Sequence, residues 1–152
     1  MGASNVTIRL LGADDAFVLE NVAEDVFDHP LEDRWITDFL SDSRHHLAVA
    51  LHDTQVVGFA SGVHYVHPDK PPELFINEIG VAPAYQRQGI GRRLMDTLLA
   101  RGRELGCAGA WVLTERENAA ARGLYAASGG LEGQDEIVLV GFDLEPKKGI
   151  DQ

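Results

Sequence analysis

Runs of residues that alternate between polar and apolar side chains mark the expected strands of this chain. Val6, Ile8 and Leu10 recur at every second position, which is the period of a half-buried strand. Later runs are rich in Val, Ile and Leu and are bounded by Gly, Pro or Asp. Gly58 and Gly62 interrupt one of these runs, which indicates a bulge or a close backbone approach. Strands are predicted at residues 5–11, 46–51, 56–66, 74–81, 110–114 and 136–144.

Apolar residues spaced three, four and seven positions apart predict the helices. The clearest helix has Ile90, Leu94 and Leu98 on one face and Gly106 as its C-terminal stop. Asn118 is a favourable N-cap residue for another helix. Helices are predicted at residues 14–26, 31–40, 89–105 and 118–127. The element order β-α-α-β-β-β-α-β-α-β predicts an α/β fold with a mixed sheet and helices on both faces.

Composition limits the classes of function. The 152 residues suit a single domain, with a core over residues 5–144 and a polar tail after them. The net charge of −11 argues against nucleic acid, whose binding needs a basic patch. No apolar run approaches the ~20 residues of a membrane span, and residues 1–7 lack the features of a signal peptide. Cys107 is the single cysteine and no Cys/His cluster has zinc-ligand spacing, so we expect a cytoplasmic protein without a disulfide or a bound metal.

Residues 86–92, Gln-Arg-Gln-Gly-Ile-Gly-Arg, carry the strongest indication of a binding site. They lead into the clearest helix, whose first backbone N–H groups have no partner within the helix. These N–H groups and the helix dipole favour an anion. Gly89 and Gly91 leave the backbone open to a phosphate, and Arg87 and Arg92 can add charge-assisted hydrogen bonds. A surface turn whose glycines serve only the chain geometry is the alternative.

The same glycines match a dinucleotide-binding fingerprint only in part. That fingerprint, Gly-x-Gly-x-x-Gly, follows a strand directly. Here Leu94 occupies the third glycine position, and a loop of several residues separates the predicted strand from Gly89. The sequence therefore disfavours a dinucleotide site.

Two segments resemble motifs of the GNAT superfamily of N-acetyltransferases. Gln86-x-x-Gly89-x-Gly91 resembles the pyrophosphate-binding motif of that family, Gln/Arg-x-x-Gly-x-Gly/Ala, and residues 118–129 resemble its Asn…Leu/Phe-Tyr-x-x-x-Gly segment. With the element order, the similarity extends over residues 5–144. It implies a GNAT fold, in which a mostly antiparallel twisted sheet has one splayed parallel strand pair. It also implies that acetyl-coenzyme A enters the gap between residues 74–81 and 110–114.

The resemblance implies roles for individual residues. Asn118 would lie near the pantetheine arm, and Tyr125 near the thioester sulfur, where it would protonate the leaving thiolate. An ammonium group must lose a proton before it attacks, and Glu78 is our candidate for the base. The alternatives are that Glu78 only binds a cation at the rim and that Tyr125 is a core aromatic residue. The remaining cofactor contacts are assigned to Ile79, Gly80, Val81, Gln86, Arg87, Gln88, Gly89, Ile90, Gly91 and Arg92.

The acceptor is expected to be a small cationic amine. Within the superfamily the chain is most similar to the short aminoglycoside 3-N-acetyltransferases, over residues 66–72, 75–81 and 141–144. This similarity implies acetylation of an aminoglycoside antibiotic at its 3-amino group, and hence antibiotic resistance. Acidic side chains suit such a polycation because they attract it electrostatically. The candidates for substrate binding are Glu32, Glu78, Glu115, Glu136 and Asp143.

Two other functions remain open at this point. The protein can be a GNAT enzyme that acetylates another amine, such as a polyamine, a metabolite or a protein N-terminus, or a sensor that binds acetyl-coenzyme A without catalysis. GNAT proteins often form dimers, so a homodimer is expected by analogy alone. Cys107 has no adjacent histidine and is interpreted as a packing residue, and the scattered histidines complete no metal-ligand set.

Overall fold

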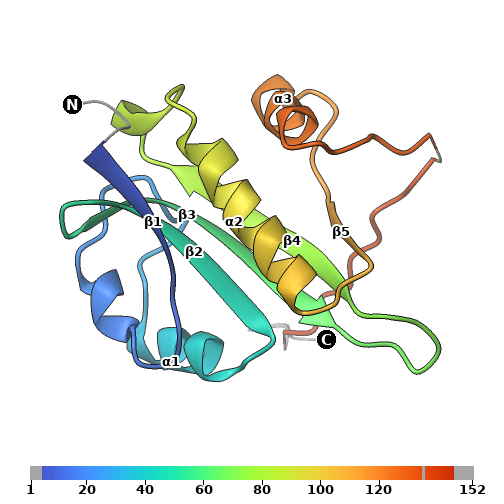
Figure 1. Cartoon of the computed structure of the whole chain (residues 1–152), viewed down its shortest axis with the longest axis horizontal. Coiled ribbons are helices and arrows are strands. Elements are labelled where there is room, and N and C mark those ends of the chain that lie inside the picture. The colour runs from blue at the N-terminus through green and yellow to red at the C-terminus, as the bar shows by residue number, and fades with distance from the viewer. Residues whose placement is uncertain (1–4, 135, 146–152) are drawn as a thin grey trace, which may run out of the picture.

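A computed structural model describes residues 5–134 and 136–145 and contains a five-stranded sheet. Strands that follow one another in the sequence also lie side by side in the sheet, in the order β1-β2-β3-β4-β5 (Figure 1). The first four strands are antiparallel, and β5 runs parallel to β4. The mixed α/β architecture is therefore confirmed. The strands are β1 (Val6–Leu10), β2 (His45–His52), β3 (Gln55–Tyr65), β4 (Glu73–Val81) and β5 (Gly109–Val112).

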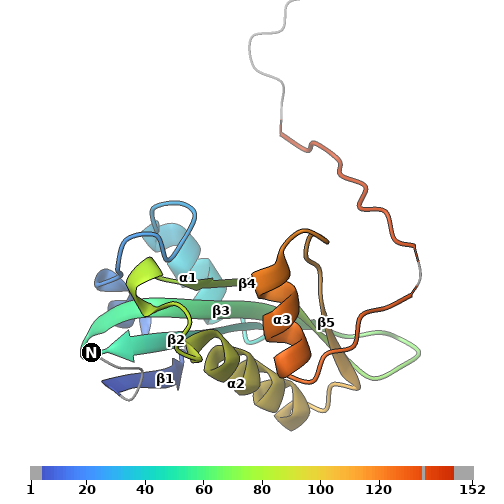
Figure 2. The same ribbon diagram turned by 90° about the horizontal axis from the view of Figure 1, so that it is seen from above.

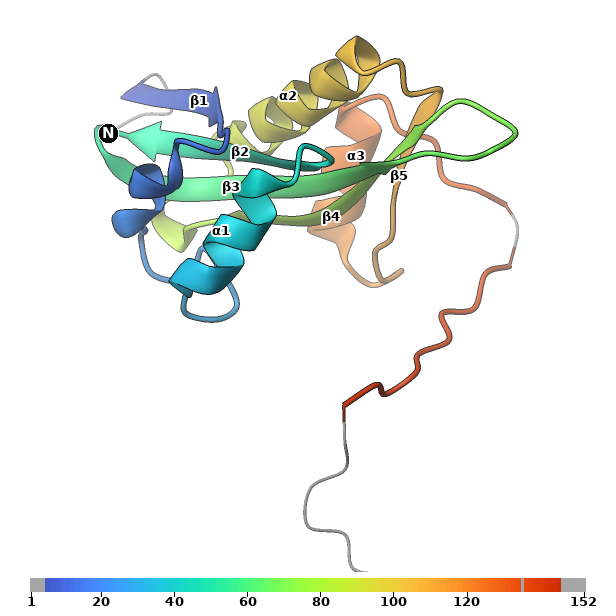
Figure 3. The same cartoon turned by 90° about the horizontal axis from the view of Figure 1, so that it is seen from below.

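Helices cover both faces of the sheet, as expected. Helix α1 (Asp33–Ser41) lies on one face, and α2 (Ile90–Glu104) lies on the other (Figures 2 and 3). Helix α3 (Ala119–Ala127) follows β5 and contacts α2. Each face has its own apolar cluster, one with α2 and one with α1. No helix within the described ranges is long and apolar enough to cross a lipid bilayer.

Helix α2 is held on the sheet by the apolar stripe that the sequence predicts. Ile90, Leu94 and Leu98 are fully buried and pack against Leu74 and Ile76 of β4. Burying one such side chain stabilises the fold by roughly 1.5–3 kcal/mol. This packing fixes the N-terminus of α2 relative to β4, which positions the candidate site described below.

An extra residue in β4 forms a bulge. Gly62 of β3 pairs with Ile76, and the next pairing joins Ser61 to Glu78, so Asn77 has no opposite residue. The expectation of a bulge or close approach at Gly62 is confirmed, because the register of β3 and β4 shifts there.

The bulge decides which face of the sheet Glu78 occupies. Side chains alternate between faces along a strand, and before the bulge Leu74 and Ile76 pack toward α2. After it, Ile79 and Val81 pack toward α2. The change from even to odd positions turns Glu78 toward α1, where it lines a pocket. Without the extra residue the same carboxylate would point at the apolar α2 cluster.

The prediction of a helix over residues 14–26 is wrong. Only the short 3-10 helix η2 (Ala16–Glu20) forms there. After it, the Ala23 amide donates to the Val56 carbonyl and the Val56 amide donates to the Asn21 carbonyl, each at 2.9 Å. The apolar residues Val18 and Val26 are nevertheless buried. The helical spacing failed as a predictor because this backbone bonds to β3 rather than to itself.

The strand predicted over residues 136–144 is also wrong for the described chain. These residues are not assigned to any strand of the sheet, and they run away from it (Figures 2 and 3). A strand requires a neighbour for its N–H and C=O groups, and within the described ranges this segment has none. Its apolar side chains are consequently exposed.

Candidate functional site

The splay between β4 and β5 leaves part of one strand edge free. The two strands pair from Glu73–Gly109 to Ile76–Val112, and the pairing ends there. Residues 77–81 of β4 therefore have no described strand on their outer side. An extended ligand that carries amide groups can bind such an edge as an added strand would. The expected gap between the two parallel strands is thus present.

The segment after β4 brings the open end of α2 close to this edge. The 3-10 helix η3 (Pro83–Tyr85) turns the chain, and the Gln86 side chain donates to the Val81 carbonyl at 3.0 Å. The first helical hydrogen bond of α2 runs from the Arg93 amide to the Gly89 carbonyl at 3.1 Å. The amides that precede Arg93 in this turn therefore have no helical acceptor and are suited to an anion.

The turn is backbone-strained, and its two glycines differ in their surroundings. Arg87 and Gly89 both have positive φ, 62° and 80°, and the arginine is in a conformation that non-glycine residues adopt rarely. A Cβ atom on Gly89 would meet no described atom within 4 Å, so the turn is open to a ligand. A Cβ atom on Gly91 would lie 3.3 Å from the Leu124 side chain, so this glycine also allows α3 to pack close to α2.

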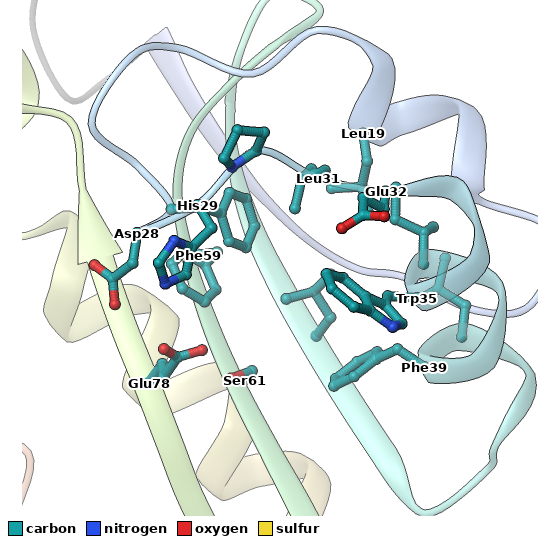
Figure 4. A pocket seen from close by; sticks show the side chains of 15 residues that line it. Leu19, Asp28, His29, Leu31, Glu32, Trp35, Phe39, Phe59, Ser61 and Glu78 are labelled. Atoms are coloured by element: carbon teal, nitrogen blue, oxygen red, sulfur yellow. The ribbon is translucent and has the colours of Figure 1, made fainter. Parts of the chain in front are cut away.

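A pocket of about 310 Å³ opens on the opposite face of β4. Glu78 lines it with Ser61 and Phe59 of β3, and Trp35 and Phe39 of α1 form the facing wall (Figure 4). Its walls are mostly aromatic and aliphatic, and Glu78 is exposed within it. A carboxylate beside the unpaired edge of β4 is suitably located to accept a proton from an amine.

The structure brings together only some of the predicted substrate-binding acids. Glu32 and Glu78 line the same pocket, and Asp28 joins them from the loop before α1 (Figure 4). Asp28 was not predicted as a site residue, because it directly follows the segment that is predicted as a helix and carries no motif of its own. Glu115 lies in the turn after β5, and Glu136 and Asp143 lie on the extended C-terminal segment. The roles of these last three remain predictions.

Tyr125 and Asn118 lie on α3. Tyr125 is half-buried against the α2 cluster, and this burial raises the pKa of its phenol above the usual value. Within the described residues its hydroxyl makes no hydrogen bond, so it is available to a ligand. Asn118 is the N-cap that the sequence predicts, since its side-chain oxygen accepts from the Ala121 amide at 3.0 Å. Its contact with the pantetheine arm stays a prediction.

Cys107, His46 and His64 lie outside this region, whereas His29 lines the pocket with Glu78 (Figure 4). Cys107 packs against the α2 cluster, and burial raises the pKa of its thiol, as expected of a packing residue. His46 and His64 are hydrogen-bonded to each other at 2.8 Å. No three His, Cys, Asp or Glu side chains in the described parts of the chain are grouped to hold a metal ion.

The splayed strand pair, the open helix start and the carboxylate beside them define an acyltransferase of the GNAT class. The model of the Acetyltransferase (GNAT) family matches residues 14–129. The chain therefore belongs to the GNAT acetyltransferase family.

Known proteins are similar to this chain over different lengths. An uncharacterised N-acetyltransferase of Mycobacterium tuberculosis is 28% identical over 119 residues, which are 78% of this chain and 73% of that protein. L-2,4-diaminobutyric acid acetyltransferase of Virgibacillus pantothenticus is 43% identical over 49 residues, only 32% of this chain and 30% of that enzyme. An aminoglycoside acetyltransferase from an uncultured soil metagenomic sample, solved with sisomicin, superposes with a TM-score of 0.76. It is 18% identical over 93% of this chain and 98% of its own, so this likeness concerns the fold.

Proposed function

We propose that this protein transfers the acetyl group of acetyl-coenzyme A to a primary amine of a small polycation. The proposed acceptor is an aminoglycoside, and the proposed position is its 3-amino group. The observation that carries the proposal is the outer edge of β4 at residues 77–81, which pairs with no strand in the described parts of the chain. The open start of α2 lies at one end of this edge, and Glu78 faces the pocket on the acceptor side. The pantetheine arm would bind along the edge and the diphosphate at the turn that contains Gly89.

The reaction needs one base and one acid. Glu78 accepts a proton from the substrate ammonium, directly or through a water, because only the neutral amine has a lone pair. The amine nitrogen attacks the thioester carbonyl, a C–N bond forms, and the C–S bond breaks. Tyr125 donates its phenolic proton to the leaving thiolate, and the resulting phenolate regains a proton from the positively charged nitrogen of the new amide, directly or through water. Its raised pKa favours the protonated phenol, which is the form that this role requires.

Charge supports a polycationic acceptor. Asp28, Glu32 and Glu78 line one pocket, in a chain whose net charge is −11. A concave site lined by one sign of charge raises the local concentration of an oppositely charged substrate. The resemblance of residues 66–72, 75–81 and 141–144 to the short aminoglycoside 3-N-acetyltransferases supports the same acceptor and the 3-amino position.

The apolar wall of the pocket favours a second candidate. Phe27, Trp35, Phe39 and Phe59 present aromatic surface beside Glu78. Such a wall suits an amine attached to an apolar group, whose burial contributes roughly 25 cal/mol per Å². This second acceptor class includes metabolite amines and protein N-termini with an apolar first residue.

An acceptor screen that measures release of free coenzyme A thiol separates these functions. The panel comprises kanamycin-class and gentamicin-class aminoglycosides, spermidine, phenethylamine, and peptides with apolar first residues. The proposal expects turnover with the aminoglycosides, and mass spectrometry with NMR then assigns the acetyl group to the 3-amino or another amino group. Turnover confined to the apolar amines would select the second candidate.

The catalytic assignment is tested on Glu78. Glu78→Gln removes the base but keeps the shape of the side chain, so turnover should fall at least ~100-fold while the Kd for coenzyme A stays nearly unchanged. Glu32→Gln, in the same pocket, is the matched control and should mainly raise KM. A loss below tenfold for Glu78→Gln would demote this residue to a binding role. Tight coenzyme A binding without turnover of any amine would instead indicate a sensor.

A further inference from the structure

A patch of mostly aromatic side chains, called here the platform, lies on the same face of the sheet as Glu78. It is formed by four residues of three neighbouring strands, Val63, Tyr65, Phe75 and Trp111. Leu74, Ile76 and Val112 belong to the α2 cluster. Because side chains alternate between faces along a strand, Phe75 and Trp111 point away from α2. They therefore lie on the side of the sheet that the bulge gives to Glu78.

No helix within the described ranges covers the platform. Helix α1 contacts β2, and β4, β5 and the loop between β3 and β4 extend beyond it (Figure 3). The α1 cluster contains none of the four side chains, none of them is buried, and Trp111 is 42% exposed. On the opposite face of the same strands, Leu74 and Ile76 are 1% exposed. This part of the sheet is thus closed on the α2 side and open on the Glu78 side.

Ring contacts and hydrogen bonds hold the platform in one arrangement. The Trp111 indole lies against the Phe75 ring, with the two centroids 4.5 Å apart. Its Nε1–H donates to the Tyr65 hydroxyl at 2.5 Å, which leaves the phenolic proton for a ligand. The Tyr65 ring packs edge-on against His67, whose Nε2 lies 2.8 Å from Oε2 of Glu73. A surface that is already ordered loses little conformational entropy when it binds a ligand.

The platform continues the proposed acceptor pocket along the same two strands. On β3, Ser61 lines the pocket, and Val63 and Tyr65 follow at the same alternation. On β4, Phe75 lies three residues before Glu78, which is about 10 Å at ~3.3 Å per residue. Two linked six-membered rings cover such a distance. One ring in the pocket and the next on the platform are therefore within reach of a single molecule.

We infer that the platform is a second acceptor subsite, which binds a sugar ring of the substrate while another ring presents its amine to Glu78. The apolar C–H face of this sugar lies on the Trp111 and Phe75 rings, where its burial is favourable. Its ammonium groups are attracted to the aromatic faces, and a hydroxyl group accepts from the Tyr65 hydroxyl. The inference rests on the proposed function for the identity of the acceptor. It makes Trp111 a residue that determines specificity for acceptors with several rings.

Acceptors of different size test the subsite. Trp111→Ala should lower kcat/KM by about tenfold for kanamycin-class and gentamicin-class acceptors, the loss of one buried ring contact. It should change kcat/KM little for 2-deoxystreptamine, the single ring that carries the 3-amino group. Trp111→Phe keeps an aromatic face and should lose less. Phe17→Ala, which removes an exposed aromatic ring of η2, is the matched control and should change neither value. Equal losses for the large and the small acceptors, or no loss, would refute the subsite.

Tryptophan emission tests the same subsite without the chemical step. In a Trp35→Phe background, Trp111 is the only tryptophan of the chain, so its emission reports on the platform. Kanamycin without acetyl-coenzyme A should change this emission saturably, and 2-deoxystreptamine should not. Turnover of aminoglycosides without an emission change would overturn the subsite and leave the proposed function in place. An emission change without turnover would remove the proposed function and retain the platform as a sugar site, whereas the absence of both overturns both.

Light scattering after size exclusion tests the other occupant of such a face, a second copy of this chain. The mass of the Trp111→Ala variant should equal that of the natural chain. A lower mass for the variant would show that a second copy covers the platform, and this result contradicts a sugar subsite.

Discussion

Gly80 is a position where a single methyl group should disturb the sheet on the face of the proposed acceptor pocket. A Cβ atom added there would lie 2.5 Å from the Val26 carbonyl oxygen and 3.0 Å from the Phe59 ring. Real Cβ contacts are essentially never shorter than 3.0 Å, so the carbonyl must move by at least 0.5 Å (3.0 minus 2.5). Val26 and Phe59 belong to the same buried cluster, which limits such a movement.

The cost of Gly80→Ala follows from two opposing effects. Overpacking a well-packed site destabilises by about 1–3 kcal/mol. The lower conformational entropy of alanine in the unfolded chain offsets about 0.4–1 kcal/mol of this. The net loss should therefore be about 1–2 kcal/mol. For a domain of this size each kcal/mol lowers Tm by about 2–4 °C, so we expect a decrease of about 2–8 °C.

Calorimetry or thermal unfolding followed by circular dichroism measures this decrease. Gly123→Ala is the matched control, because a Cβ atom there meets no described atom within 4 Å and alanine favours the helix. This control should leave Tm unchanged or raise it. Since the added methyl group points toward Phe59, KM for the acceptor should rise more than Kd for coenzyme A. Equal Tm values for Gly80→Ala and Gly123→Ala would refute the close approach of the Val26 carbonyl.

Three further predictions concern chemistry and charge. Tyr125→Phe should lower kcat by about 10²-fold in steady-state assays without changing Kd for coenzyme A, because it removes only the donated proton; an unchanged kcat would exclude the acid role. Burial, with nearby positive charge from His64, Arg101 and His45, lowers the pKa of His46 to about 4. In the unfolded chain the pKa of His46 is about 6.5, so the unfolded chain binds the proton at a higher pH than the folded one. The free energy of unfolding therefore decreases as pH falls from 6.5 to 4, by about 2 kcal/mol at pH 5. Urea unfolding at pH 7.5 and 5 should show this loss in the natural chain and a smaller one in His46→Gln. Finally, KM for an aminoglycoside should rise steeply with salt, since separated charges are screened, and a flat dependence would refute electrostatic attraction.

Sequence patterns within a short window predict the helices and turns that are stabilised by residues close together in the chain. The stripe of Ile90, Leu94 and Leu98 predicts α2, because these residues share one face at helical spacing and are buried. The turn before α2 is also predictable, since glycines at positions 89 and 91 and the start of a long helix occur together in the sequence. The N-cap at Asn118 follows from its side chain alone.

Contacts between distant segments decide the features that the sequence did not predict. Residues 21–23 have helical apolar spacing, but they bond to Val56, more than thirty positions away. Gly62 on β3 predicts a bulge or a close approach, but the extra residue, Asn77, lies in β4, where no local marker gives its position. Asp28 enters the pocket because the loop that carries it folds back over the sheet. None of these follows from residue type within a short window.

The strand β4 links the two halves of the proposed reaction. Ile79 and Val81 pack toward α2, whose open start suits the cofactor diphosphate, whereas Glu78 faces the proposed acceptor pocket on the opposite side. An acetyl group held at the unpaired edge between them is therefore accessible from both faces of the sheet. If β5 paired with β4 along its whole length, the edge would be occupied and the cofactor would be separated from Glu78. The early end of the β4–β5 pairing at Ile76 and the bulge at the next residue thus act together, since one opens the edge and the other orients Glu78, the proposed base.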